Sequence, residues 1–200
     1  HSARFDESLR SYIIDKFETT DEYQSQGNES SVFFREILKL PKNVGRTLSI
    51  MNELGALGAF MPEFKELNGF LQHGVYHSFT ADEHTLIAIQ NVEKLANETS
   101  QLGIIFNKLK DKEQLFLGLL LHDIAKPINI SGHEIIGAEL ATSIMHRMGY
   151  SESEIDTVSF LVYNHLIMEQ TAFRRNLNDP ETLNSFTSRF NSIEYLDQLY

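Results

Sequence analysis

The sequence carries an adjacent His–Asp pair, His122 and Asp123, directly after the apolar run Leu115–Leu121. Neighbouring side chains on a helix point about 100° apart, so both face one target only at a helix end and around a compact object such as a metal ion. Three further histidines fall at expected helix ends or first turns, namely His84, His133 and His165. This set predicts a divalent metal site, and the alternative is a hydrogen-bonded helix end without a metal.

The chemistry of such a site follows from its ligand types. One carboxylate among imidazoles favours Mn, Fe, Co, Ni or Zn over an all-oxygen calcium site. Water bound to such an ion has a lowered pKa and attacks a phosphorus centre near neutral pH, so no protein nucleophile is required. The chain contains no cysteine, which leaves histidine, carboxylate and hydroxyl groups to supply the chemistry. Lys126 precedes Pro127 and is expected either to contact phosphate or act as a general acid, or to be a solvated lysine.

The bulk composition bounds the class of protein. The chain has 200 residues, of which 42% are hydrophobic, enough for one domain with a buried core, with or without a helical extension. Its net charge of −11, from 17 basic and 28 acidic residues, argues against non-specific binding to nucleic acid. No apolar run approaches the roughly 20 residues that a membrane span needs, and no basic leader opens the chain. We therefore expect a soluble, cytoplasmic protein without a nucleic-acid or membrane partner.

Apolar periodicity and capping signals predict an all-α protein, because no segment alternates with period two for long. Helices are expected over about residues 5–17, 31–40, 43–54, 80–96, 102–109, 112–124, 133–149, 151–166, 180–190 and from 192 onward. Their expected first residues include Asn43, Thr80 or Asp82, Ser151 and Asp179. The helix over 112–124 is apolar nearly all round, which predicts that it lies at the centre of a bundle.

Several stretches resemble a known family. LQHGVYHSFTADEHTL at 71–86, YNHLIM at 163–168 and TAFRRNLNDP at 171–180 are similar to the HD domain of the bifunctional uridylyltransferase/uridylyl-removing enzymes, the GlnD family, within the HD-domain metal-dependent phosphohydrolases. MNELGALG at 51–58 and PEF at 62–64 resemble the helical linker that leads into that domain. The resemblance covers the chain from about residue 31 onward. It implies an HD helical bundle over residues 71–200, preceded by a helical linker and N-terminal extension over 1–70.

The resemblance also implies roles for individual residues. His84 matches the first metal-ligand histidine, and His122 and Asp123 match the central pair, with Asp123 bridging. His133 and His165 match the additional histidines of two-metal members. The implied cofactor is a divalent metal, with Mn, Fe, Mg, Co, Ni and Zn as candidates and with one or two ions left open.

The remaining site residues carry positive charge. With Asp123, Lys126 is expected to be catalytic and also to bind substrate. Arg174 and Arg175 suit bidentate contact with phosphate and are expected to bind substrate, or else to be a solvated pair at a helix start.

In that family the domain hydrolyses the uridylyl-tyrosine phosphodiester of a PII-type signalling protein and releases UMP. The expected function is therefore metal-dependent removal of UMP from uridylylated PII. The alternatives are an HD phosphohydrolase acting on a free nucleotide and a degenerate, non-catalytic HD regulatory module. No glycine-serine turn followed by paired aspartates occurs, so an upstream nucleotidyltransferase domain and downstream regulatory domains are expected in the full-length protein.

Two features depart from the family pattern. The final aspartate of the HD pattern is expected one helix after Leu196, but the sequence stops at Tyr200 inside an apolar-periodic segment. We therefore expect a C-terminally truncated piece of a longer protein. The loop Lys126–Glu134 lacks a glycine-rich run and is more similar to the corresponding loop of tRNA nucleotidyltransferases, so the substrate is the least specified part of this interpretation.

Overall fold

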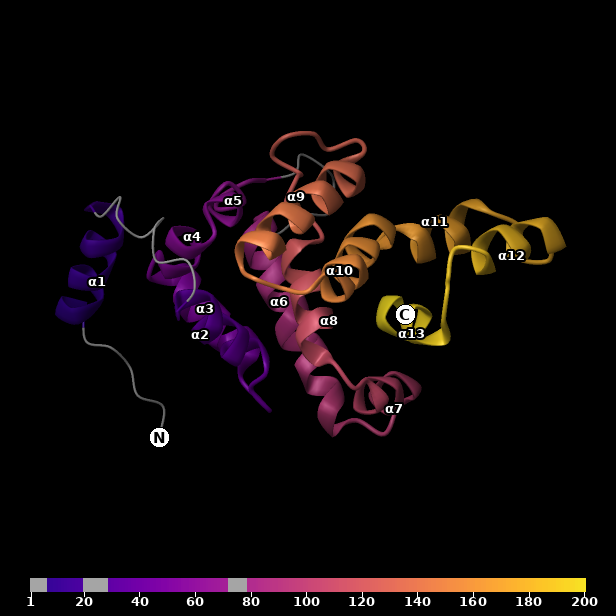
Figure 1. Cartoon of the computed structure of the whole chain (residues 1–200), viewed down its shortest axis with the longest axis horizontal. Coiled ribbons are helices and arrows are strands. Elements are labelled where there is room, and N and C mark those ends of the chain that lie inside the picture. The colour runs from indigo at the N-terminus through magenta and orange to yellow at the C-terminus, as the bar shows by residue number, and fades with distance from the viewer. Residues whose placement is uncertain (1–6, 20–28, 72–78) are drawn as a thin grey trace.

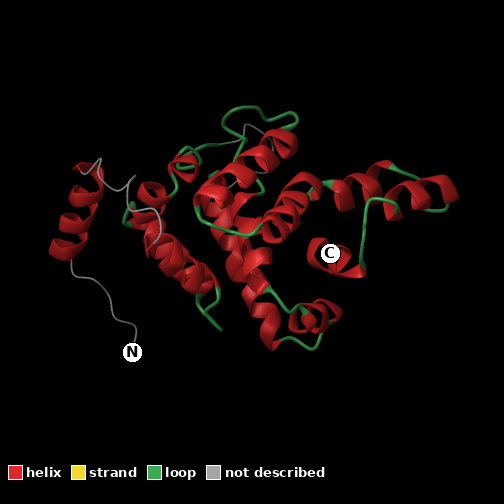
Figure 2. Ribbon diagram, in the orientation of Figure 1, coloured by secondary structure: helices red, strands yellow, loops and turns green. Residues whose placement is uncertain are grey.

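The computed structural model describes residues 7–19, 29–71 and 79–200, and every regular element within these ranges is a helix (Figure 1, Figure 2). The predicted all-α class is therefore confirmed. His73 and His77, which belong to the stretch quoted for the resemblance, lie outside the described residues. The elements are α1 (Glu7–Thr19), α2 (Glu29–Leu38), α3 (Val44–Glu53), α4 (Ala56–Phe60), α5 (Pro62–Lys65), α6 (Ala81–Lys94), the 3-10 turn η2 (Leu95–Asn97), α7 (Gln101–Lys108), α8 (Lys112–Leu121), α9 (His133–Arg147), α10 (Glu152–Asn164), α11 (Ile167–Arg174), α12 (Pro180–Thr187) and α13 (Ile193–Leu199).

Helix α8 lies at the centre of the bundle, as its apolar sequence predicts. It contacts α10, α6 and α2, and α10 packs along α9 on its other side (Figure 1). Its side chains are buried in nearly every direction, including Leu117, Leu120 and Leu121, which have no exposed surface. Burial of each such side chain stabilises the fold by about 1.5–3 kcal/mol, so the position of the end of α8 is set by the core itself.

Small residues let the central helices approach closely. A Cβ added to Gly118 of α8 would lie 3.2 Å from the Leu161 Cβ of α10. A Cβ added to Gly137 of α9 would lie 3.2 Å from the Val162 Cγ1 of α10. These contacts bring the carboxyl ends of α8 and α10 and the start of α9 to one end of the bundle.

The helix starts follow the predicted signals with one exception. The Ser151 N–H donates to the Glu154 carboxylate at 2.8 Å, which confirms the capping box that begins α10. The corresponding residue of α6 is Thr80, while Asp82 instead accepts hydrogen bonds from Asn52 and from the Gly69 N–H.

Asn43 was predicted to cap a helix. It does stand directly before α3, but its side chain does not form the capping hydrogen bond. Asn43 precedes α3 with φ of 68°, and its side chain makes no capping hydrogen bond. The first N–H groups of α3, from Val44 and Gly45, instead donate to the Glu93 carboxylate of α6 at 2.7 and 2.8 Å. A carboxylate suits a helix N-terminus, but nothing local in the sequence identifies one supplied from a distant helix.

The helices that precede residue 70 pack on the core. Helix α2 contacts α8, α3 contacts α6, and α1 contacts α4. Gly45 lies so close to Gln90 of α6 that an added Cβ would meet the Gln90 backbone nitrogen at 2.8 Å. The segment expected to be a linker therefore packs against the bundle through two of its helices, α2 and α3.

The C-terminal helices leave the bundle and return to it. Helices α11 and α12 extend to one side of the molecule, and α13 returns beside α10 (Figure 1). Helices α4, α5 and α11 were not predicted as separate elements. Helices α4 and α5 have only five and four residues, too few to show a helical period, and α11 follows α10 after two residues. Among the described residues, no helix is long and apolar enough to cross a membrane.

Candidate metal centre

The predicted metal ligands meet at one end of the bundle. His122 follows α8, His133 begins α9, His165 follows α10, and His84 lies in the first turn of α6. They surround Asp123, which is 1% exposed. A cavity of about 330 Å³ opens beside them and is lined by His84, His122, Asp123, Lys126 and His165 with apolar residues of α8 and α10 and with Gln198 and Leu199 of α13.

A tight turn after α8 directs Asp123 inward. The Ile124 N–H donates to the Leu121 carbonyl, and the Lys126 N–H donates to the Asp123 carbonyl. Ile124 and Ala125 are buried and anchor the turn in the core. The next residue, Pro127, has no N–H and cannot continue the helix. The side chain of Asp123 is consequently fixed on the bundle side of the turn.

Three histidine rings are held in the same way. The Nδ1 atoms of His122, His133 and His165 lie 2.7, 2.8 and 2.7 Å from backbone carbonyl oxygens of Leu119, Ile130 and Val162, each three residues earlier. A carbonyl only accepts, so each Nδ1 carries the hydrogen and each Nε2 presents a lone pair to the centre. This arrangement of a backbone carbonyl behind a ring is characteristic of metal-ligating histidines.

The two oxygens of Asp123 face two groups of residues. Its Oδ1 lies 3.3 Å from His133 Nε2 and 3.8 Å from His165 Nε2. Its Oδ2 lies 3.1 Å from His122 Nε2 and 2.7 Å from Lys126 Nζ, although neither approach has the geometry of a hydrogen bond.

Two triads of candidate ligands therefore share Asp123. One is His84, His122 and Asp123, and the other is Asp123, His133 and His165. Within each triad the ligand atoms lie within 4.8 Å of one another.

The electrostatics of the centre favour a cation. Burial disfavours a charge on Asp123, but the imidazoles of His122 and His133 and the ammonium of Lys126 outweigh it and lower the pKa of this carboxyl below its usual value. Hydrogen bonding to Asp123 raises the pKa of His133. Burial lowers the pKa of His165 to about 4, so its ring is neutral at pH 7. A proton on His133 and a divalent ion are thus alternative positive charges beside the same carboxylate.

The spacing of the donor atoms fits a divalent metal ion. His133 Nε2 and His165 Nε2 lie only 3.1 Å apart, and two atoms bound about 2.1 Å from one ion are separated by about 3.0–3.4 Å. The buried Asp123 Oδ2 has no hydrogen-bond partner among the described residues, and a metal–oxygen contact would supply one interaction for it. The cluster of histidine and aspartate is therefore compatible with metal binding.

The other predicted site residues divide between two places. Lys126 lies in the cavity beside the cluster and pairs with Asp123. Arg174 and Arg175 are exposed at the end of α11 and line a separate cavity of about 650 Å³ between α11 and α12. The structure does not bring these two arginines to the cluster.

One residue of the cavity was missed by sequence reasoning. Gln198 of α13 is 8% exposed, and its buried Oε1 has no hydrogen-bond partner among the described residues. It lies three residues after Tyr195, which packs on Phe160, so the helical period of α13 already placed it on the inward face.

Comparison with known proteins agrees with the geometry. The family model described as HD domain matches residues 81–194, which contain all five clustered residues. Over 197 residues the chain is 36% identical to the bifunctional uridylyltransferase/uridylyl-removing enzyme of Erythrobacter litoralis, covering 96% of this chain and 21% of that protein.

Enzymes with the same description from two other bacteria are also similar. The chain is 36% identical over 184 residues to that of Cereibacter sphaeroides (90% of this chain, 20% of the relative) and 31% identical over 177 residues to that of Acinetobacter baumannii (86% and 20%). The chain thus spans about a fifth of the length of these curated relatives.

Proposed function

Because the chain belongs to the HD domain family, we propose that it is a metal-dependent phosphohydrolase domain whose His–Asp cluster holds one or two divalent ions. His84 and His122 would bind on the Oδ2 side of Asp123, and His133 and His165 on the Oδ1 side. Asp123 would bridge the two positions. Mn, Fe, Mg, Co, Ni and Zn are the candidate ions, and the three imidazoles with defined Nε2 lone pairs favour the ions that accept nitrogen ligands.

A bound divalent ion supplies a polarised phosphoryl oxygen and a water of lowered pKa. The protein residues supply orientation and charge around it. The backbone carbonyls behind His122, His133 and His165 fix the ring directions, and the buried turn fixes Asp123. Lys126 Nζ lies at the cavity next to Asp123, and its ammonium would contact a phosphate oxygen or donate a proton to a leaving oxygen.

We propose that the substrate is a uridylylated protein of the PII type and that the product is UMP. Water would attack the phosphorus of the uridylyl-tyrosine diester, the bond from phosphorus to the tyrosine oxygen would break, and that oxygen would leave with a proton. The support for this substrate is the similarity over 86–96% of the chain to proteins described as uridylyl-removing enzymes. Arg174 and Arg175, exposed and away from the cluster, would contact the protein part of such a substrate. Nucleotidyltransferase and regulatory domains would belong to the rest of a longer protein.

A free nucleotide is the second candidate substrate. The cavity of about 330 Å³ beside the cluster is of the size that holds small ligands. A panel of cyclic nucleotides and nucleoside monophosphates, assayed in parallel with uridylylated PII, separates the two. A chain that binds metal but hydrolyses neither class would be a non-catalytic HD regulatory module.

The observation that carries the proposal is the pair of triads that share Asp123. Its test is hydrolysis by the Mn²⁺-loaded chain, with release of UMP from uridylylated PII as the readout. Asp123→Ala should abolish release while helicity is retained, and Asp156→Ala, which removes an exposed carboxylate of α10, should leave the rate unchanged. A folded, metal-loaded chain without phosphodiesterase activity would contradict the proposal, and unfolding of Asp123→Ala would make the His–Asp pair structural.

A further inference from the structure

The cavity beside the His–Asp cluster contains one polar side chain that the proposed chemistry does not use. Gln198 of α13 lines this cavity together with the cluster, and it is the only amide among the described lining residues. Its side chain is 8% exposed, and its buried Oε1 has no hydrogen-bond partner in the part of the chain that the structure describes. A buried acceptor without a donor destabilises a fold, so its presence calls for a donor from outside the fold.

Helix α13 fixes the position of Gln198. At the start of α13 the Ser192 hydroxyl accepts the Tyr195 N–H at 3.4 Å, and the Tyr195 ring packs on Phe160 of α10 with the ring centres 4.6 Å apart. Gln198 follows Tyr195 by three residues and therefore lies on the same, inward face of α13. The buried acceptor is thus a fixed part of the cavity wall.

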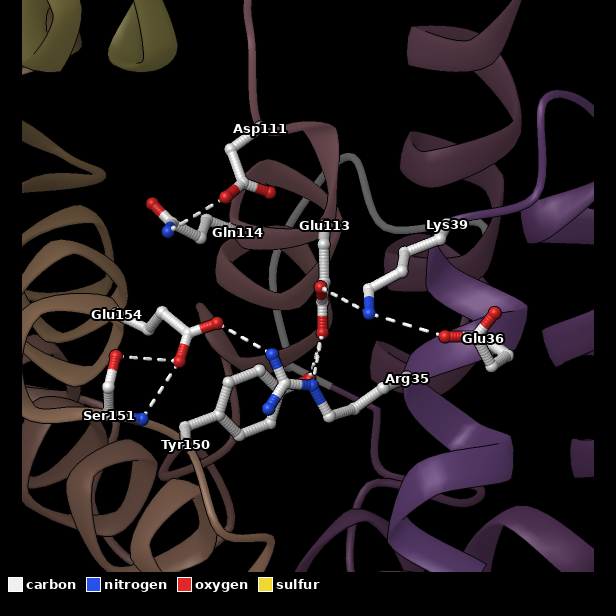
Figure 3. Close-up of polar contacts among 9 residues, drawn as sticks. All are labelled: Arg35, Glu36, Lys39, Asp111, Glu113, Gln114, Tyr150, Ser151 and Glu154. Carbon is white, nitrogen blue, oxygen red and sulfur yellow. Dashed lines mark hydrogen bonds and ion pairs between the residues drawn. The ribbon is translucent and has the colours of Figure 1, made fainter.

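The polar residues on the other side of Gln198 do not supply the donor. They line a neighbouring cavity of about 380 Å³, which Gln198 also borders. The Gln114 amide of that cavity donates to Asp111 at 3.2 Å (Figure 3), and the hydroxyls of Thr157 and Tyr195 lie 3.4 Å apart. Solvent or a bound ligand therefore has to supply the donor to Gln198 Oε1.

The metal cavity is charged at one end and carries the amide at the other. One face of α8 lines it, through Leu115, Gly118, Leu119 and His122, which are spaced three and four residues apart. This face extends roughly 10 Å from its first residue to the cluster. Gln198 lies towards the start of the face, because it also borders the neighbouring cavity that residues at the starts of α8 and α10 line. The cluster lies at the ends of the same two helices.

We infer that Gln198 recognises the base of a uridylyl group whose phosphate lies at the His–Asp cluster. A nucleotide has its phosphate and its base at opposite ends, and the cavity has the cluster and the amide at opposite ends. The edge of uracil presents an N–H donor beside a carbonyl acceptor, and an amide presents the complement. The uracil N3–H would donate to Gln198 Oε1, and Gln198 Nε2 would donate to a uracil carbonyl.

The apolar wall of the cavity suits the rest of the base. The leucines that line it, which would contact the flat faces of the ring, are Leu115, Leu119, Leu161, Leu166 and Leu199. Ligand sites are commonly apolar with a few polar groups that fix orientation, and here Gln198 would be such a group. The inference rests on the proposed function, which brings a uridylyl group to the cluster.

Calorimetric titration of the Mn²⁺-equilibrated chain with UMP and with ribose 5-phosphate tests the inference. The two probes share the sugar and the phosphate and differ by the base. Gln198→Leu should weaken UMP binding at least about fivefold, because the uracil N3–H then has no acceptor, and should change ribose 5-phosphate binding by less than about twofold. Equal losses for the two probes, an unchanged affinity for UMP, or no binding of UMP at millimolar concentration would overturn the inference.

Two further measurements separate recognition from a structural role. Gln170→Leu, which changes an amide of α11 outside both cavities, should leave UMP binding unchanged. The urea midpoint of Gln198→Leu should equal or exceed that of the unchanged chain, because the substitution removes a buried acceptor without a partner. A lower midpoint would assign the amide a role in the fold and overturn the inference.

Release of UMP from uridylylated PII by the same protein tests the proposed function separately. Release of UMP without a base-dependent effect of Gln198→Leu would refute only this inference. A base-dependent effect without release of UMP would uphold the recognition by Gln198 and refute only the proposed activity.

Discussion

The Nε2 atoms of His133 and His165 face each other at 3.1 Å, while the Nδ1 atom of each ring contacts a backbone carbonyl. With both Nδ1 atoms protonated, the two facing nitrogens are both acceptors unless a proton or a metal lies between them. The lowered pKa of His165, due to burial, leaves this ring neutral at pH 7. The pair is therefore held for a cation by helices α9 and α10 rather than by attraction between the rings.

His165→Gln tests this relationship. Removal of one nitrogen ligand should lower the affinity for Mn²⁺ about 10- to 100-fold, the range seen when support of a metal site is lost. If the pair serves the metal rather than the fold, the free energy of unfolding in EDTA should change by less than about 1 kcal/mol. Metal titration and urea unfolding measure the two quantities. A large loss of stability in EDTA with unchanged metal affinity would show that the pair is structural.

Lys126→Met tests whether Lys126 acts on the substrate. Loss of the ammonium should lower the rate of diester hydrolysis about 100-fold, in the lower range for general acid catalysis. Metal affinity should stay equal or rise, because one positive charge 2.7 Å from Asp123 is removed. Steady-state kinetics at saturating Mn²⁺ give the rate, with Lys65→Met as the matched exposed control. If the loss disappears at higher metal concentration, Lys126 affects metal binding and not catalysis.

Much of the fold follows from local sequence signals. Thr80, Ser151, Asp179 and Ser192 each precede a helix in the structure, because capping depends on residues next to one another. The Glu93 carboxylate that caps α3 was not predictable, because it comes from a distant helix.

In the candidate site, too, some features were predictable from the sequence and others depend on the packing of distant helices. The identities of the five clustered residues came from their types and from family resemblance. The apolar run before His122 predicted the position of His122 and Asp123, and the expected bounds of the other helices predicted those of His84, His133 and His165. The carbonyl contacts that orient the rings, and the division of Asp123 between two triads, depend on how α8, α9 and α10 pack. Arg174 and Arg175 follow His165 closely in the sequence, but α11 leads away from the cluster. Closeness in sequence therefore did not predict where these two arginines lie.

The packing of α3 on α6 gives a prediction about stability. An added Cβ at Gly45 would lie 2.8 Å from the Gln90 backbone nitrogen, so Gly45→Ala must displace α3 and should destabilise the fold by about 1–3 kcal/mol. Gly118→Ala is the comparison, because its nearest neighbours at 3.1–3.2 Å are side-chain atoms of Leu161 and alanine favours a helix. Urea unfolding of both variants measures the difference. Equal stabilities for Gly45→Ala and the unchanged chain would mean that α3 does not pack closely on the core.

The ion pair between Glu63 and Arg147 predicts a dependence of stability on pH. Burial acts to raise the pKa of Glu63, but two hydrogen bonds from Arg147, at 2.7 and 2.8 Å, outweigh it and lower the pKa. A carboxyl whose folded pKa is depressed contributes stability above its unfolded pKa of 4.5, and that contribution is lost as the pH falls through the folded value.

Glu63→Gln should therefore be less stable than the unchanged chain at pH 7, by less than about 1 kcal/mol because Arg147 is half exposed. The difference should shrink below pH 4.5. Urea unfolding over this range measures it, and a difference that stays constant with pH would exclude the linkage.

The binding of metal to the shared Asp123 is the central claim, and its most direct test is the metal content of the chain after equilibration with Mn²⁺ and removal of free ions. We predict one or two Mn²⁺ per chain, with a higher melting temperature, and loss of both in Asp123→Asn at unchanged helicity. At a metal concentration 100 times the dissociation constant the stabilisation should be about 2.7 kcal/mol. A well-folded chain that retains no Mn²⁺, Fe²⁺ or Zn²⁺, or an Asp123→Asn variant that retains as much as the unchanged chain, would contradict the account.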